Sequence, residues 1–114
     1  IHVSALSPHT RDLQADPRVS LMLMAPRTPG DEPLALARLS LQADAELLEP
    51  GTPAHAAAEA AYRARFAGSD VTFGLGDFSL VRLRTRSARF VAGFGRAHAL
   101  GQAAWQALMS GQGA

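Results

Sequence analysis

The sequence contains no cysteine, and all eleven of its basic residues are arginine, so lysine is absent as well. The lack of cysteine excludes disulfide bonds, zinc–thiolate sites and thiol catalysis. No apolar run approaches the roughly 18–20 residues that a membrane-spanning helix needs, and no signal peptide is visible. We therefore expect a cytoplasmic protein that has no membrane among its partners.

Strong charge of either sign is also missing, because the formal net charge is +1 at pH 7. A near-neutral chain lacks the field of a non-specific nucleic-acid binder, so no nucleic-acid partner is expected. The four histidines (His2, His9, His55 and His98) are scattered, and no metal site is predicted. No serine or aspartate lies in a nucleophile-elbow context, so no catalytic residue is assigned. Any chemistry is expected to come from a cofactor.

The 114 residues predict a single domain, 1–114, that is large enough to bury a core without disulfides or metals. The chain opens on Ile1 inside an apparent strand, so we expect further native sequence upstream, including the first strands of the domain.

The chain is organised around residues 4–17. Ile1 and Val3 predict the end of a strand, and Ser7 is a favourable N-cap for a helix whose first residue is Pro8. Pro17 ends that helix because it disfavours the helical conformation at the residue before it. The apolar run 18–25 then predicts a strand covered on both faces.

The remaining pattern is mainly β with flanking helices. We expect a strand over 34–49 with a β-bulge near Ala37, a helix from Pro53 to Ala67, a loop over 71–77, strands over 78–86 and 89–94 separated by a turn at 87–88, and a helix over 102–109. A long strand that bends midway suits an antiparallel barrel. The glycine pairs at 74–76 and 93–95 are interpreted as turn residues, because they do not form a dinucleotide-binding fingerprint.

Two groups of residues are candidate anion sites. Ser4, Ser7, His9, Thr10 and Arg11 surround the free amides at the start of the first helix, where an anion would be favoured. An ordinary capped helix on the surface explains the same residues equally well. Arg82, Arg84 and Arg86 form a basic strip along one strand face. A solvated face is the favoured interpretation of that strip, and contact with phosphate, haem propionates or a partner's acidic groups is the other.

Four stretches resemble one family. Residues 4–13 (SALSPHTRDL), 16–21 (DPRVSL), 76–83 (GDFSLVRL) and 89–97 (RFVAGFGRA) are similar to segments of the pyridoxamine 5′-phosphate oxidase-like FMN-binding split barrels. The similarity is greatest to the branch that includes haem-utilisation proteins. It implies an antiparallel split β-barrel of six strands that forms a homodimer and binds FMN between its subunits.

The resemblance also implies which residues hold the cofactor. Ser4 matches the hydroxyl-bearing strand end, and His9 falls where many members carry a phosphate-binding lysine. Thr10 and Arg11 extend the helix start, and Arg38 falls near a position that touches the flavin. Asp12 replaces a common asparagine and brings a negative charge to the proposed phosphate. The substrate residues of true pyridoxamine 5′-phosphate oxidases have no match.

These observations lead us to expect an FMN-binding flavoprotein, a flavin-dependent oxidoreductase that acts on an unknown small-molecule substrate. The first alternative is a haem-binding or haem-degrading protein on the same fold, in which the arginine strip or His98 would face the porphyrin. The second is a structural or regulatory dimer without a cofactor.

Overall fold

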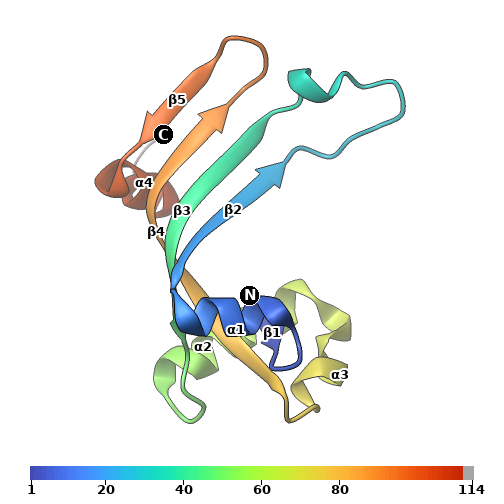
Figure 1. Ribbon diagram of the computed structural model, residues 1–114, viewed down its shortest axis with the longest axis vertical. Helices are drawn as coiled ribbons and strands as arrows, with labels where there is room; N and C mark the ends of the chain where they lie inside the picture. The colour runs from blue at the N-terminus through green and yellow to red at the C-terminus, as the bar shows by residue number, and fades with distance from the viewer. Residues whose placement is uncertain (112–114) are drawn as a thin grey trace. The chain divides into compact units, whose positions relative to one another are not determined.

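The computed structural model describes residues 1–111, and Figure 1 labels most of its elements. In chain order the elements are β1 (His2–Ser4), α1 (Pro8–Ala15), β2 (Arg18–Met24), η1 (Pro33–Ala35), β3 (Arg38–Leu47), α2 (Pro53–Arg65), η2 (Ala67–Ser69), α3 (Asp70–Phe73), β4 (Phe78–Val91), β5 (Ala97–Leu100) and α4 (Gln102–Met109). Within the described residues, every helix falls short of the length and apolar character needed to span a membrane.

The strands follow the order β1-β4-β3-β2, and β5 also pairs with β4. The pairings of β1 with β4, of β2 with β3 and of β4 with β5 are all antiparallel. β1 pairs with the first residues of β4, from Phe78 to Leu80, whereas β5 pairs with its last ones, from Ala88 to Val91. The expected fold class, an antiparallel sheet with flanking helices, is confirmed.

The internal contacts divide the chain into two compact units. The first unit contains residues 1–17 and 45–83, and the second contains residues 18–44 and those from 84 onward. The division falls within β3 and within β4, so both strands contribute residues to both units.

The first unit contains the capped helices that the sequence predicts. The hydroxyl of Ser7 accepts a hydrogen bond from the N–H of His9 at 3.3 Å, and Pro8 is the first residue of α1. Asp16, which precedes Pro17, has an extended backbone and ends the helix. At the start of α2, Thr52 accepts from the N–H of His55 at 3.2 Å.

Each unit has a small apolar core. Leu48, Leu80 and Val81 are buried in the first unit, where the N–H of Leu48 donates to the carbonyl of Leu80 at 3.0 Å. The buried apolar side chains of the second unit include Leu41 and the small residues Ala43 and Ala88.

The predicted strand over 34–49 is too long, because η1 occupies its first residues and β3 begins at Arg38. The pairing of β2 with β3 is regular from Arg38 to Asp44, and the N–H of Ala25 continues it to the carbonyl of Ala37. The predicted β-bulge near Ala37 is therefore wrong. The alternation changes phase there because Leu34 and Leu36 precede the strand.

Three further expectations need correction. The predicted loop over 71–77 includes part of α3, and the predicted turn at 87–88 lies inside β4, where Ala88 is buried and pairs with Leu100. The sequence pattern predicts that β2 is covered on both faces, but Met22, Leu23 and Met24 are 58%, 50% and 52% exposed. An apolar run by itself does not show whether a strand is exposed or covered, because its exposure depends on which elements lie beside it.

The homodimer stays a prediction. The exposed apolar residues of β2 lie on the strand that ends the described strand order, and a stable dimer buries on the order of 2,000 Å² or more in total. We expect light scattering at micromolar concentration to give twice the mass of one chain. A monomer across that range would contradict the prediction.

Core packing in the first unit gives a stability prediction. Leu80 is 3% exposed, so Leu80→Ala should lower the free energy of unfolding by about 2–5 kcal/mol through lost burial and the cavity left behind. Leu6, which is 81% exposed, provides the control variant Leu6→Ala, which should change stability by less than about 0.5 kcal/mol. Urea unfolding of the three proteins compares these values, and equal losses in both variants would exclude Leu80 as a core residue.

Candidate functional site

At the helix start where the sequence predicts an anion site, the hydroxyls of Ser4 and Thr10 form hydrogen bonds within the protein. The hydroxyl of Ser4 donates to a carboxylate oxygen of Asp77 at 3.0 Å and accepts from the N–H of Leu6 at 3.1 Å. The side chain of Thr10 is buried, and its hydroxyl donates to the carbonyl of Ser4. These bonds join the end of β1 to α1, so both hydroxyls already have structural partners.

The same geometry is unfavourable for a phosphate. The carboxylate of Asp77 lies beside Ser4. Its negative charge would repel a phosphate dianion at this position. His9 and Arg11 are exposed on α1. Ser4, His9, Thr10 and Arg11 thus lie in one strand–helix joint, whereas Arg38 belongs to the second unit. Their role as cofactor ligands stays a prediction.

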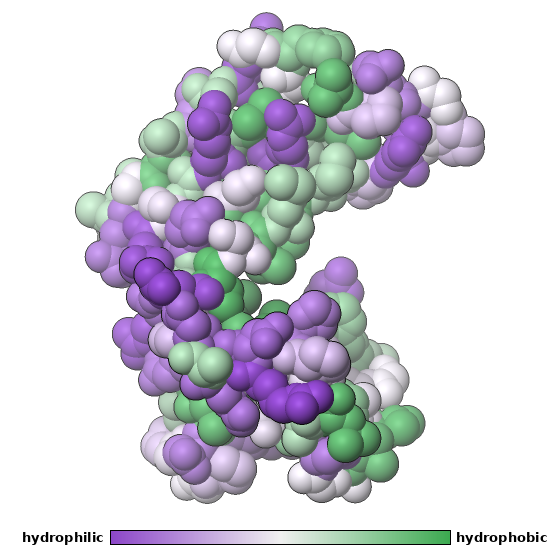
Figure 2. All heavy atoms as spheres, viewed as in Figure 1, coloured by the Kyte–Doolittle hydropathy of each residue, from purple (hydrophilic) through white to green (hydrophobic). Residues whose placement is uncertain are grey.

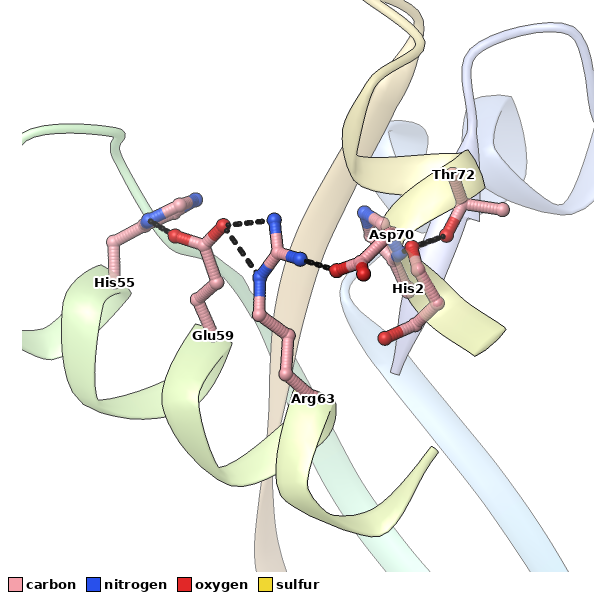
Figure 3. A network of polar contacts seen from close by, with 7 residues as sticks. His2, His55, Glu59, Arg63, Asp70 and Thr72 are labelled. Carbon is pink, nitrogen blue, oxygen red and sulfur yellow. Dashed lines mark hydrogen bonds and ion pairs between the residues drawn. The ribbon is translucent and has the colours of Figure 1, made fainter. Parts of the chain in front are cut away.

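A polar network connects α2 with the segment that follows it in the first unit (Figure 3). Glu59 accepts from Nε and Nη2 of Arg63 at 3.2 and 3.0 Å, and Arg63 also pairs with Asp70. The Nδ1 atom of His55 lies 4.0 Å from Glu59, one helical turn away. These side chains are partly exposed, and ion pairs of this kind contribute about 0–1 kcal/mol each.

Pairs such as His55 and Glu59 also occur among metal ligands, but they need further donors. Among residues 1–111, no group of three or more histidine, aspartate or glutamate side chains lies in a position to hold a metal ion. The pairing of Arg63 with Asp70 connects α2 to α3.

His2 lies in an aromatic cluster of the first unit. Its ring stacks on Phe73 with a centroid distance of 4.2 Å, and its Nδ1 atom is 3.2 Å from the hydroxyl of Thr72. Tyr62 and Phe78 lie close to the same ring, at 5.4 and 5.1 Å. Burial lowers the pKa of His2 below its usual value. The positively charged amino terminus, His55 and Arg63 lower this pKa further, and the negative charge of Glu59 acts in the opposite direction.

The second unit contains an open pocket of about 400 Å³, which we call the arginine pocket. Residues of η1, β3, β4 and β5 and the β4–β5 turn surround it, and Figure 1 shows η1 and this turn at the same end of the unit. Its lining is Leu34, Arg38, Arg89, Val91, Gly93, Phe94, Gly95, Arg96 and Ala97. Arg38 is the one cofactor residue proposed from the sequence that lies here.

The β4–β5 turn places Arg96 beside the end of β4. The N–H of Ala92 donates to the carbonyl of Arg96 at 2.9 Å, and Gly93 and Gly95 have φ angles of +122° and +70°. L side chains rarely adopt such angles, so glycine is strongly favoured at both positions. A Cβ atom at Gly93 would lie 3.3 Å from the carbonyl oxygen of Ala35, so the turn packs closely against η1. The interpretation of Gly93 and Gly95 as turn residues is confirmed.

The charge of the arginine pocket is available to a ligand. Within the described part of the chain, Arg38, Arg89 and Arg96 have no ion-pair partner. The predicted basic strip differs, because Arg82 lies 4.0 Å from Glu46 and Arg86 lies 3.3 Å from Asp44. The strip is therefore a solvated face with paired charges, as favoured, rather than a site for an anion.

Apolar surface accompanies this charge. Phe94 and Leu34, which line the arginine pocket, are 67% and 61% exposed. Figure 2 shows apolar and hydrophilic residues side by side at the end of the unit where the β4–β5 turn lies. His98 pairs with Phe90, one position away from Val91 and Ala97, which line the pocket. Because neighbouring strand residues alternate between faces, His98 lies on the opposite face of the hairpin.

Comparison with solved structures confirms the split-barrel fold. The chain superposes on a haem-binding protein from Mycobacterium smegmatis with a TM-score of 0.83 and 36% identity, covering 94% of this chain and 43% of that one. A structure of HutZ from Vibrio cholerae, described as a haem storage protein, gives a TM-score of 0.64 and 29% identity over 73% of this chain and 59% of that one.

A curated relative is also named as a haem protein. The chain is 31% identical over 99 residues to the haem oxygenase HutZ of Vibrio cholerae, and the aligned region covers 84% of this chain and 55% of that protein. The named relatives are haem proteins. The chain spans about half the length of the curated relative, and no family model matches the sequence.

These names correct the main functional expectation. The sequence favours an FMN-dependent flavoprotein oxidoreductase, but the relatives are named as a haem oxygenase, a haem-binding protein and a haem storage protein. The alternative that the sequence left open, a haem protein on the same fold, agrees better with them.

Sequence reasoning missed most of the arginine pocket. It proposed Arg38 but passed over Arg89, Arg96 and Phe94. A sequence signal was present, because the Gly-Phe-Gly turn lies between Arg89 and Arg96. A turn by itself, however, does not indicate which strand its side chains contact.

The pKa of His2 predicts a pH dependence of stability. An unfolded histidine titrates near pH 6.5. Because the folded state favours the neutral ring, the stabilising contribution is present above about pH 6.5 and is lost as the pH falls through the lowered pKa. His2→Phe keeps an aromatic ring in the cluster but removes the titrating group. The variant should therefore lose less stability than wild type between pH 7.5 and pH 5.

Urea unfolding midpoints at the two pH values measure this difference. His98→Gln is the matched control, because His98 is exposed and the variant should keep the full wild-type loss. A loss in His2→Phe as large as that of wild type would show that His2 does not cause the pH dependence.

Proposed function

We propose that this protein binds haem in the arginine pocket and belongs to the haem-utilisation branch of the pyridoxamine 5′-phosphate oxidase-like barrels. The observation that carries the proposal is the pocket itself, which is lined by three arginines without ion-pair partners in the described residues and by Phe94 and Leu34, whose side chains are exposed. The names of the relatives support the same ligand.

The chemistry of the pocket suits this ligand. Haem has a broad apolar face and two carboxylates, and it needs apolar contact together with cationic partners. Phe94, Leu34 and Val91 provide apolar surface, and the arginines provide planar donors that match a carboxylate. When bound, haem would supply the redox chemistry of its iron.

The proposal assigns no ligand to the iron. Among the described residues that line the arginine pocket there is no histidine, methionine or tyrosine, and His98 lies on the other face of the hairpin. The residues of the pocket therefore hold the macrocycle through its apolar face and its carboxylates.

Haem binding should depend on Phe94. Its side chain is 67% exposed, so a bound macrocycle can cover it, and covering a large apolar side chain contributes about 1.5–3 kcal/mol. Titration of hemin into the purified protein should give saturable growth of a Soret band. Phe94→Ala should weaken this binding roughly ten- to hundredfold.

Leu6→Ala is the control, because Leu6 is exposed in the first unit, and its hemin affinity should equal that of wild type. If hemin gives no saturable band with wild type, the proposal that the protein binds haem is wrong. Equal affinity of Phe94→Ala and wild type would place haem outside the arginine pocket.

A further inference from the structure

We infer that Arg38, Arg89 and Arg96 form a seat for the two propionate carboxylates of haem, so that the pocket distinguishes the free acid from its esters. This inference rests on the proposed function and goes beyond it, because it assigns the residues that select the ligand. It follows from the placement of three cations on three different segments around one pocket.

The backbone holds the three arginines in place before any ligand binds. Arg38 begins β3 opposite Met24, and Arg89 lies on β4 opposite Ala99. Arg96 is held in the turn by the hydrogen bond between its carbonyl and the N–H of Ala92. Since the strands fix these positions, binding needs only side-chain ordering, and a preorganised site loses less affinity to ordering.

The lack of internal partners gives the seat its preference for anions. No carboxylate of the described residues pairs with Arg38, Arg89 or Arg96, so three unpaired arginines line one pocket. A ligand with two carboxylates can form charge-assisted hydrogen bonds with them, which are roughly twice as strong as neutral ones. Arginine does so with two parallel bonds, which an esterified group cannot match.

The apolar residues cannot provide this selectivity. Phe94, Leu34 and Val91 contact a macrocycle in the same way whether its side chains are acids or esters. Discrimination between hemin and hemin dimethyl ester therefore isolates the contribution of the arginines. The difference in affinity between hemin and its dimethyl ester should also decrease at high salt, because exposed charges are screened.

The experiment titrates hemin and hemin dimethyl ester, in the same dilute detergent, into wild type and two variants. Wild type should bind hemin at least about tenfold more tightly than the ester, which is the range for losing a hydrogen bond to a charged group. In Arg38→Gln and in Arg96→Gln, hemin affinity should fall roughly tenfold and the affinity for the ester should stay within about threefold of wild type.

Two choices keep the test decisive. Arg96 lies on an exposed turn, so Arg96→Gln retains the fold even if the half-buried Arg38 does not tolerate glutamine. Arg27→Gln is the matched control, since Arg27 is an exposed arginine of the same unit that does not line the pocket. It should keep the full preference for hemin.

The outcomes separate the two proposals. If wild type binds neither hemin nor the ester, the proposed function fails. If wild type binds both equally, or if Arg38→Gln and Arg96→Gln keep the preference for hemin, the protein binds haem but the propionate seat is wrong. A tenfold preference that the two variants lose and Arg27→Gln retains would support both.

Discussion

β4 runs from Phe78 to Val91, and its antiparallel pairing positions both candidate sites of this protein. At its first residues it pairs with β1, which leads into the joint where Ser4 and Thr10 bond. At its last residues it pairs with β5, whose turn places Arg96 and Phe94 at the arginine pocket. The backbone hydrogen bonds of this one strand therefore determine which distant residues become neighbours.

Two sets of three arginines in this chain differ in their surroundings, although composition does not distinguish them. Arg63, Arg82 and Arg86 pair with carboxylates of neighbouring residues, and such pairs on exposed surfaces contribute little stability. Arg38, Arg89 and Arg96 adjoin an apolar surface without such partners in the described residues. The proposed haem binding rests on this combination of unpaired charge and exposed apolar side chains.

The family resemblance gave the correct fold, whereas the relatives are named for haem and not for the FMN that the resemblance implied. Residues 4–13 resemble a segment that holds a flavin phosphate in related barrels, but here Ser4 and Thr10 serve the joint between β1 and α1. Side-chain hydroxyls can satisfy the free backbone groups where a strand turns into a capped helix, whether or not a phosphate binds. The motif is therefore compatible with this architecture with or without a phosphate.

The sequence by itself determined the local elements whose signals lie within a few residues. Ser7, Pro8 and Pro17 specify α1, and Gly93 and Gly95 specify a turn, because caps, fixed φ angles and positive φ angles are local properties. The sequence did not determine that Leu34 precedes the strand or that Ala88 continues one, since both depend on neighbouring strands. Only the tertiary structure brought Arg38 to Arg89 and Arg96, because the pairing of β3 with β4 joins segments that lie far apart in the sequence, and local sequence signals do not specify which distant strands become neighbours.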